Sequence, residues 1–382
     1  MDASRSLPNT DGPRRRARDA GITIGRIAPG QLNAITDVPG VEVGHATIVA
    51  GEGPLVVGKG PVRTGVTVVI PRRTIASEPV FAGYHVLNGN GEMTGLLWVE
   101  ESGLLTTPIG ITNTHSVGIV RDAIIAAEAG RFRNSEEFAF SLPVVAETYD
   151  GYLSDINGMH VTAAHVFQAL EDAKGGPVAE GCVGGGTGMI CHGFKGGIGT
   201  ASRTLLAEQG GWTVGALVQA NYGQRALLRI DGVPIGRMLD HTQIPEPDRA
   251  PPAGTGSIIV ILATDAPLLP TGCRRLAQRA TLGIARMGGL GENSSGDLFL
   301  AFSTANSGLG SNSPQDRVRH VSMLAAEAMS PLFEAAGEAT EEAILNALCA
   351  ATTTTGINGR VVHAMDVGRV AEIMRRYQEP GG

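Results

Sequence analysis

The sequence predicts an α+β fold in which runs of strands and runs of helices form layers. Short apolar runs alternate with Gly, Pro and Asn turns from residue 22 onward, and helix candidates gather in the C-terminal third. Separate runs of strands and of helices are typical of layered α+β domains. Of the 382 residues, 54 are glycine, without a collagen period. Glycine so far above its usual share of about 7% indicates many tight turns and close backbone approaches.

The expected elements follow the chain in order. Apolar runs bounded by turn residues predict strands at residues 41–43, 65–70, 110–112, 213–219, 226–230, 257–263 and 297–303. Helices are expected at residues 117–129, 161–173 and 268–286, with two more within 314–350. Residues 231–256 are rich in proline and predict a surface linker. The first twenty or so residues are polar and are expected to be loosely held.

The charge balance excludes some classes of protein. Lys and Arg number 30 against 37 Asp and Glu, which gives a net charge of −7. A nucleic-acid binder normally has a basic surface, so this balance argues against nucleic acid as a partner. The concentrated basic run at residues 14–18 is typical of a solvated N-terminal arm. No stretch approaches the roughly 20 apolar residues of a membrane helix, and no signal-peptide core follows the arginines, so we expect no membrane partner.

The cysteines indicate the compartment. Cys182, Cys191, Cys273 and Cys349 are scattered and form no C-x-x-C pair. A chain of this size does not need disulfides for stability, so they are interpreted as reduced thiols. The sequence therefore predicts a cytoplasmic protein.

Ser257 is the most informative residue. It follows Gly256 and is expected to open a buried strand, after the turn-rich residues 251–256. If its hydroxyl attacks the Gly256 carbonyl and the ester is hydrolysed, Ser257 becomes a new N-terminus, with an α-amino base beside the nucleophile. Glycine leaves the carbonyl open to attack and tolerates strained backbone angles. The same residues also fit an ordinary buried strand that begins with serine.

Several common signatures are absent. The glycine cluster at residues 184–189 lacks the last glycine of G-x-G-x-x-G, and neither a P-loop nor a G-x-S-x-G elbow occurs. The cluster is better interpreted as backbone packing or an oxyanion-type turn. His160 and His165 are five residues apart, so they do not share a helix face as a zinc pair would. The other histidines occur singly, and we expect no metal site.

Small polar residues in glycine-rich, apolar settings remain. They form the stretches 147–151, 220–223 and 293–297. Together with Gly256-Ser257, the chain contains NAITDVPGV at 33–41, NGNGEMTG at 88–95, IGITNTHS at 109–116, GGGTGMI at 184–190, FKGGIG at 194–199 and SGD at 295–297. On these stretches the chain closely resembles the L-aminopeptidase/D-amidase-esterase and β-peptidyl aminopeptidase family of self-processing serine hydrolases. The resemblance is distributed over nearly the whole chain.

The resemblance implies a fold and a maturation step. The fold would be an α/β/β/α sandwich, two sheets between helical layers, similar to N-terminal-nucleophile hydrolases but with distinct connectivity. Cleavage of the Gly256–Ser257 bond would yield an α-chain of residues 1–256 and a β-chain of residues 257–382, together one folded domain. Similar proteins assemble as homo-oligomers, namely tetramers of such processed protomers.

The resemblance also implies roles at the nucleophile. Ser257 Oγ would form an acyl-enzyme, and its α-amino group, with a reference pKa near 7.7–8.0, could accept the proton. Ser295 and Asp297 would activate or orient the nucleophile. Some relatives carry Glu where this chain has Asp297, and the shorter side chain changes how the carboxylate reaches the amine.

Three further residues complete the implied site. The Asn221 amide would donate to the oxyanion, and Tyr149 would hydrogen-bond the intermediate or the reacting amine. Glu147 would hold the ammonium group of the substrate, although a structural ion pair is the alternative for this carboxylate.

The function implied is that of an aminopeptidase or amidase that releases an N-terminal residue from short peptides, amino-acid amides or esters, with no cofactor. One alternative is an acyltransferase of the ornithine acetyltransferase type, although that group uses a threonine nucleophile. The other is an unprocessed, non-catalytic homologue. The sequence does not discriminate between L-α, D-α and β-amino residues at the N-terminus of the substrate.

Overall fold

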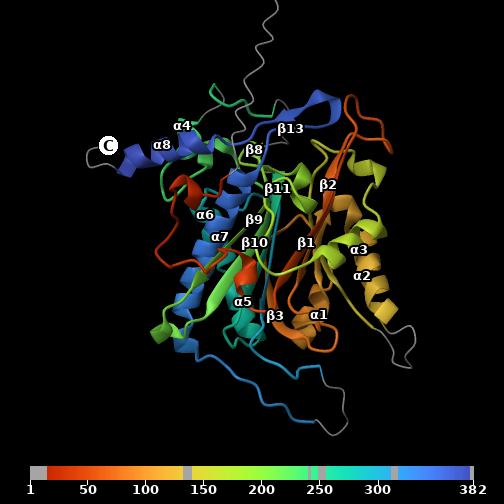
Figure 1. Cartoon of the computed structure of the whole chain (residues 1–382), viewed down its shortest axis with the longest axis vertical. Helices are drawn as coiled ribbons and strands as arrows, with labels where there is room; N and C mark the ends of the chain where they lie inside the picture. The colour runs from red at the N-terminus through yellow and green to blue at the C-terminus, as the bar shows by residue number, and fades with distance from the viewer. Residues whose placement is uncertain (1–14, 132–139, 240–241, 248–254, 311–316, 379–382) are drawn as a thin grey trace, which may run out of the picture.

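The computed structural model describes residues 15–131, 140–239, 242–247, 255–310 and 317–378. Two β-sheets lie face to face between two layers of helices (Figure 1). Helices α2 and α3 cover one sheet, and α5, α6 and α7 cover the other (Figure 1). The helices are α1 (Leu96–Ser102), α2 (Val117–Arg131), α3 (Ala163–Asp172), α4 (Ile235–Met238), α5 (Pro270–Ala277), α6 (Ala280–Arg286), α7 (Ser330–Ala350) and α8 (Val367–Gln378). This is the α/β/β/α arrangement expected from the resemblance.

The larger sheet has six strands in the order β4-β3-β12-β11-β10-β9. They are β4 (Leu104–Leu105), β3 (Val80–Gly89), β12 (Ser294–Ser303), β11 (Thr255–Thr264), β10 (Thr213–Asn221) and β9 (Gly197–Thr204). β11 and β12 are parallel, and the neighbouring pairs are antiparallel. Both faces of this sheet are covered, so its central strands β11 and β12 contain continuous apolar runs rather than alternating ones.

The smaller sheet has four strands in the order β1-β2-β5-β6. They are β1 (Glu42–Ala50), β2 (Val62–Ile70), β5 (Ile109–Asn113) and β6 (Val144–Thr148). Two hairpin-like pairs complete the set: β7 (Ile190–Cys191) with β8 (Phe194–Lys195), and β13 (Thr354–Thr355) with β14 (Val361–Val362). β6 is an edge strand and contacts β11 of the larger sheet.

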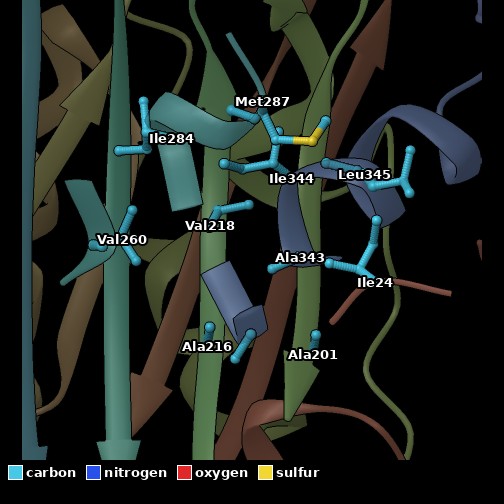
Figure 2. Packing of buried hydrophobic residues seen from close by; sticks show 14 of the residues in the cluster. Ile24, Ala201, Ala216, Val218, Val260, Ile284, Met287, Ala343, Ile344 and Leu345 are labelled. Atoms are coloured by element: carbon cyan, nitrogen blue, oxygen red, sulfur yellow. The ribbon is translucent and has the colours of Figure 1, made fainter. Parts of the chain in front are cut away.

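Three apolar cores follow from the layers. One lies between the sheets and includes Ile111 and Ile259, and a second lies between the smaller sheet and α2 and α3. The largest lies under α7, where Ala343 and Ile344 approach Ala201, Ala216 and Val218 on β9 and β10 (Figure 2). Interiors are close-packed, so the small residues of this core set how near the helix can come.

A glycine fixes the approach of α7 to the sheet. A Cβ atom added to Gly199 on β9 would lie 2.0 Å from the Ala343 carbonyl oxygen of α7. No side chain fits into that space, so the close helix–sheet contact requires glycine at this position. Part of the glycine excess is therefore explained by packing between layers.

The N-terminal arm differs from the expectation where it is described. Arg16 donates to the carbonyls of Leu32, Asn33 and Thr200, and Arg18 pairs with buried Glu342 on α7. These arginines are tied to the core, where they supply the hydrogen bonds that its carbonyl and carboxylate oxygens need. Residues 1–14 lie outside the described part of the chain.

Three element predictions were wrong. Residues 226–230 do not form a strand, because Arg225–Leu227 is a 3-10 turn and Ile230 forms only an isolated bridge with Val233. The helix expected at 268–286 is two helices, α5 and α6, and the two expected within 314–350 are one long helix, α7. The linker expected at 231–256 contains α4, and its residues 240–241 and 248–254 lie outside the described part.

Among the described residues, no helix combines the length and apolarity that a bilayer crossing requires.

Candidate active site

Ser257 lies near the start of β11, in the middle of the larger sheet. It stands opposite Asn221 of β10 on one side and Gly296 of β12 on the other. The strand begins two residues earlier than expected, at Thr255. At this end of the sheet a cavity of about 1050 Å³ opens, lined by residues that include Ser257, Asn221, Tyr149 and Glu147. Gly256 lines it too, so five of the predicted site residues share one cavity.

The Ser257 hydroxyl is held against the bond that would be cut. Its Oγ donates a hydrogen bond to the Gly256 carbonyl oxygen at 2.6 Å and accepts one from the Gly296 N–H at 3.3 Å. The side chain is only 5% exposed. A nucleophile and its target carbonyl are thus in contact within one continuous strand, and a backbone N–H already hydrogen-bonds the hydroxyl oxygen.

Gly256 is required for space rather than for its backbone angles. Its φ is not positive, so the tolerance of glycine for strained backbone angles is not used here. A Cβ atom added here would lie 2.9 Å from the Asn221 carbonyl oxygen and from Tyr222 Cα. Any side chain would therefore force β10 and β11 apart beside the nucleophile.

Ser295 and Asp297 form a buried pair on the opposite face of the sheet from the Ser257 side chain. Ser295 Oγ donates to Asp297 Oδ1 at 2.6 Å, and Asn88 Nδ2 donates to Asp297 Oδ2 at 3.1 Å. Both line a small second cavity together with Gly256. The pair thus lies beside the Gly256–Ser257 bond but makes no hydrogen bond to Ser257 Oγ.

Burial shifts the pKa of Asp297. Its side chain is 2% exposed, and desolvation raises the pKa of this carboxyl above its usual value. Hydrogen bonds from Ser295 and Asn88 oppose that shift. A desolvated carboxylate of this kind attracts a nearby ammonium group, which is what the α-amino group of a new N-terminus would supply.

Asn221 is oriented by two backbone groups. Its Oδ1 accepts from the Ile190 N–H at 2.8 Å, and its Nδ2 donates to the Tyr149 carbonyl at 3.1 Å. The hydrogen bond from the Ile190 N–H identifies Oδ1 as the acceptor end of the amide. The second hydrogen of Nδ2 is then left for the cavity beside Ser257. This geometry suits a preorganised donor to an oxyanion.

Glu147 is buried at the cavity wall and is held by two donors. Its carboxylate accepts from the Glu92 N–H at 3.1 Å and from the Thr114 hydroxyl. Burial raises the pKa of Glu147, and these hydrogen bonds lower it in part. Among the described residues it has no ion-pair partner, so an ammonium group from a ligand would find it uncompensated.

Tyr149 is the most exposed of the six residues, at 47%. Its hydroxyl lies beside Gly151, where an added Cβ atom would stand 2.4 Å from the Tyr149 oxygen. Tyr149 is the first residue after β6, and it lines the cavity together with Gly151.

Sequence reasoning missed several groups at the cavity. Glu92, Glu246, Glu292 and Arg360 also line it. Asp150, which follows Tyr149 in the chain, is fully buried, and burial raises its pKa to about 7. Asn88, the second partner of Asp297, stands in the NGNGEMTG stretch and could have been found there. Nothing in the local pattern marks Arg360, because it reaches the cavity from a turn more than 100 residues after Ser257.

Comparisons with known proteins agree over nearly the whole chain. The sequence matches the profile of peptidase family S58 over residues 33–362. It is 48% identical over 379 residues to the β-peptidyl aminopeptidase BapA of Sphingosinicella microcystinivorans, covering 97% of this chain and 94% of that protein. The BapA of Sphingosinicella xenopeptidilytica is 45% identical over 369 residues, covering 94% of this chain and 91% of that protein.

Solved structures give the same result for the fold. A β-aminopeptidase from a Burkholderia species superimposes with a TM-score of 0.88 at 54% identity, covering 96% of this chain and all of that one. The L-aminopeptidase D-Ala-esterase/amidase of Ochrobactrum anthropi gives a TM-score of 0.85 at 44% identity, covering 95% and 98% of the two chains. That structure is described as a prototype for the serine aminopeptidases and a new variant among the Ntn hydrolase fold.

Proposed function

Because this chain belongs to peptidase family S58 and is a serine aminopeptidase/amidase, we propose that Ser257 is its nucleophile and that the chain matures by cutting itself before this residue. The observation that carries the proposal is the 2.6 Å hydrogen bond between Ser257 Oγ and the Gly256 carbonyl oxygen. Attack of Oγ on the Gly256 carbonyl carbon forms an ester and breaks the C–N bond, and the released Ser257 nitrogen takes up the proton that Oγ loses. Water then hydrolyses the ester, which leaves chains 1–256 and 257–382.

The mature site would use the new amine as its base. The α-amino group of Ser257 accepts the Oγ proton when Oγ attacks the substrate carbonyl, and it passes that proton to the leaving amine. Ser295 and Asp297 lie beside the Gly256–Ser257 bond, where they can hold this amine in place. Water then attacks the acyl-enzyme and regenerates the hydroxyl.

Three side chains would bind the charged groups of the substrate and of the intermediate. Asn221 Nδ2, fixed by the bonds of the amide to Ile190 and Tyr149, donates to the oxyanion. Glu147 holds the ammonium group of the substrate, and Tyr149 contributes its hydroxyl to the same bound end. A buried carboxylate that is paired only when a free amine binds accounts for release of one N-terminal residue at a time.

We propose a β-amino residue as the preferred N-terminal residue of the substrate. Support comes from the relatives at 45% to 54% identity, which are named β-peptidyl aminopeptidases or β-aminopeptidases. The acetyltransferase and non-catalytic alternatives are not favoured, because those relatives are named as aminopeptidases and the match covers nearly their full length.

The assembly and the compartment are proposed from the surface and from the cysteines. We propose a homo-tetramer of processed protomers, for which exposed apolar side chains such as Leu97 and Met323 provide surface to cover. The four cysteines form no disulfide with one another, which supports a cytoplasmic enzyme. Light scattering of the purified protein measures the mass of the assembly directly.

The experiment for the proposed function compares the wild type with Ser257→Ala on p-nitroanilides of L-alanine, D-alanine and β-homoalanine. We expect the wild type to release p-nitroaniline fastest from the β-homoalanine compound and Ser257→Ala to release none. Equal turnover by the two proteins would exclude Ser257 as the nucleophile. Faster turnover of an α-amino compound would contradict the substrate preference alone.

A further inference from the structure

The charges around the cavity are unequal. Four glutamates line it, Glu92, Glu147, Glu246 and Glu292, against two arginines, Arg225 and Arg360. An acidic cavity attracts the ammonium end of a peptide and repels its carboxylate end. A short peptide has both ends within reach of one site, so the position of the cations decides whether its carboxylate is tolerated.

Arg225 is not available to a ligand. Its guanidinium donates to the carbonyls of His192, Leu239, Ile244 and Gly193, and it lies 3.3 Å from the centre of the Phe194 ring. The residue is 3% exposed. Its donors are occupied by the protein, so it is a structural cation.

Arg360 differs from Arg225 in both its exposure and its contacts. It is half-buried and faces the cavity. Its Nη1 donates to the Tyr152 carbonyl at 3.2 Å, and its guanidinium lies 4.8 Å from the centre of the Tyr152 ring. No carboxylate of the described residues pairs with it, so Nε and Nη2 are left for a ligand. The cation–π contact holds the planar group in one orientation, which favours bidentate binding of a carboxylate.

Arg360 is held on a fixed support. It follows a short turn, Ile357–Gly359, whose first N–H donates to the Leu153 carbonyl at 2.9 Å. Leu153, Tyr152 and Val362 form a small apolar cluster against which Ile190 packs. Ile190 is the residue whose N–H donates to Asn221 Oδ1. Packed contacts thus connect Arg360 to the Asn221 side of the nucleophile.

Glu147 lies on the other side of Ser257. A Cβ atom added to Gly91 would stand 3.1 Å from both Glu147 Oε1 and Gly296 Cα, so the carboxylate is close to β12. Two residues later along the same segment, the Tyr149 carbonyl binds Asn221 on β10. The sheet order β12-β11-β10 therefore places Ser257 between the Glu147 end and the Asn221–Arg360 end of the cavity.

We propose that Arg360 binds the C-terminal carboxylate of di- and tripeptide substrates and thereby makes the enzyme prefer short peptides with a free C-terminus. The inference rests on the proposed function, because it takes Glu147 as the site of the substrate ammonium group. A peptide bound with its amine at Glu147 and its first carbonyl at Ser257 continues toward Arg360. Each further residue adds at most about 3.6 Å of reach, so only short peptides place the carboxylate at this arginine.

The test measures kcat/KM for matched pairs: β-alanyl-L-leucine and β-alanyl-L-leucyl-glycine, each as the free acid and as the C-terminal amide. We expect the wild type to favour the acid by about tenfold for at least one of the two lengths, as a charge-assisted pair at a half-exposed site would give. Arg360→Gln should bring that ratio close to one. Arg360→Lys keeps the positive charge but loses the planar guanidinium that binds a carboxylate through two hydrogen bonds, so it should give an intermediate ratio.

The matched control is Arg376→Gln, an exposed arginine on α8 that pairs with Glu372 and should keep the wild-type ratio. Equal kcat/KM for acid and amide at both lengths in the wild type would overturn the inference. So would an unchanged ratio in Arg360→Gln, because a merely structural role through Tyr152 lowers both members of a pair equally. A wild type that hydrolyses neither the peptides nor any p-nitroanilide would instead contradict the proposed function.

Discussion

Asn221 and Ser257 lie directly opposite each other on the antiparallel strands β10 and β11. The pairing fixes the side-chain amide beside the hydroxyl without any loop between them, since both residues belong to strands of the central sheet. Sites built on regular elements hold their geometry better than sites on loops. The hydrogen bonds of the Asn221 amide to Ile190 and Tyr149 complete that rigidity.

Replacing Asn221 by Asp should lower kcat with little change in KM. The substitution keeps the oxygen that accepts from Ile190 but removes Nδ2, so the oxyanion loses its donor and the Tyr149 carbonyl loses one hydrogen bond. Loss of one such donor costs about 10² to 10³ in kcat. Steady-state kinetics with the best p-nitroanilide measures the effect. A kcat within about twofold of the wild type would remove Asn221 from that role.

Glu147→Gln should abolish the discrimination between free and blocked amines. The wild type is expected to hydrolyse a free β-amino anilide far better than its N-acetyl form, because the buried carboxylate requires a cation. The glutamine variant should lose about 10² in kcat/KM on the free substrate, which corresponds to a lost charged hydrogen bond of about 1.5–3 kcal/mol. If the wild type hydrolyses both forms equally, Glu147 does not bind the ammonium group.

Gly256→Ala should impair maturation. The new Cβ atom would stand 2.9 Å from the Asn221 carbonyl oxygen, so β10 and β11 must separate at the scissile bond. We expect the intact chain to accumulate on denaturing gels and Tm to fall, with overpacking costing about 1–3 kcal/mol.

Gly118→Ala is the matched control for that substitution. Gly118 is exposed in α2, and an added Cβ atom there would meet nothing within 4 Å. Alanine in a helix is more stable than glycine by about 0.5–1 kcal/mol, so this variant should mature normally with an equal or higher Tm. Normal maturation of Gly256→Ala would show that the close approach at Asn221 does not matter for cleavage.

Asp150→Asn should change how stability depends on pH. Burial raises the pKa of Asp150 from 3.8 to about 7, so the folded protein binds this proton more tightly than the unfolded chain does. The contribution of the protonated group to stability is complete below about pH 4 and declines as pH rises to about 7, by about 1.4 kcal/mol per pH unit. Asparagine cannot ionise and removes that decline.

The measurement is urea unfolding of both proteins at several pH values between 4 and 8. The difference in unfolding free energy between Asp150→Asn and the wild type should move in favour of the variant as pH rises. Parallel curves over this range would contradict the assignment of the raised pKa to Asp150.

The sequence predicted the layers and the strand at 257–263 because apolar runs and turn residues are local signals. It did not reveal that Ser295 and Asp297 lie on the opposite face of the sheet from the Ser257 side chain, since that depends on the register between β11 and β12. The length of α7 was missed because its buried glutamates, such as Glu342, look polar until their partner Arg203 is placed. Arg360 reaches the cavity only through the tertiary fold.

The most direct test of self-cleavage is the intact mass of the active wild-type enzyme under denaturing conditions, beside that of Ser257→Ala. We expect two wild-type chains that divide between Gly256 and Ser257, the smaller beginning with Ser257-Ile258-Ile259, and one full-length chain for the variant. A fully active wild type that consists only of the uncut 39.5 kDa chain would contradict the account, because the α-amino base would not exist.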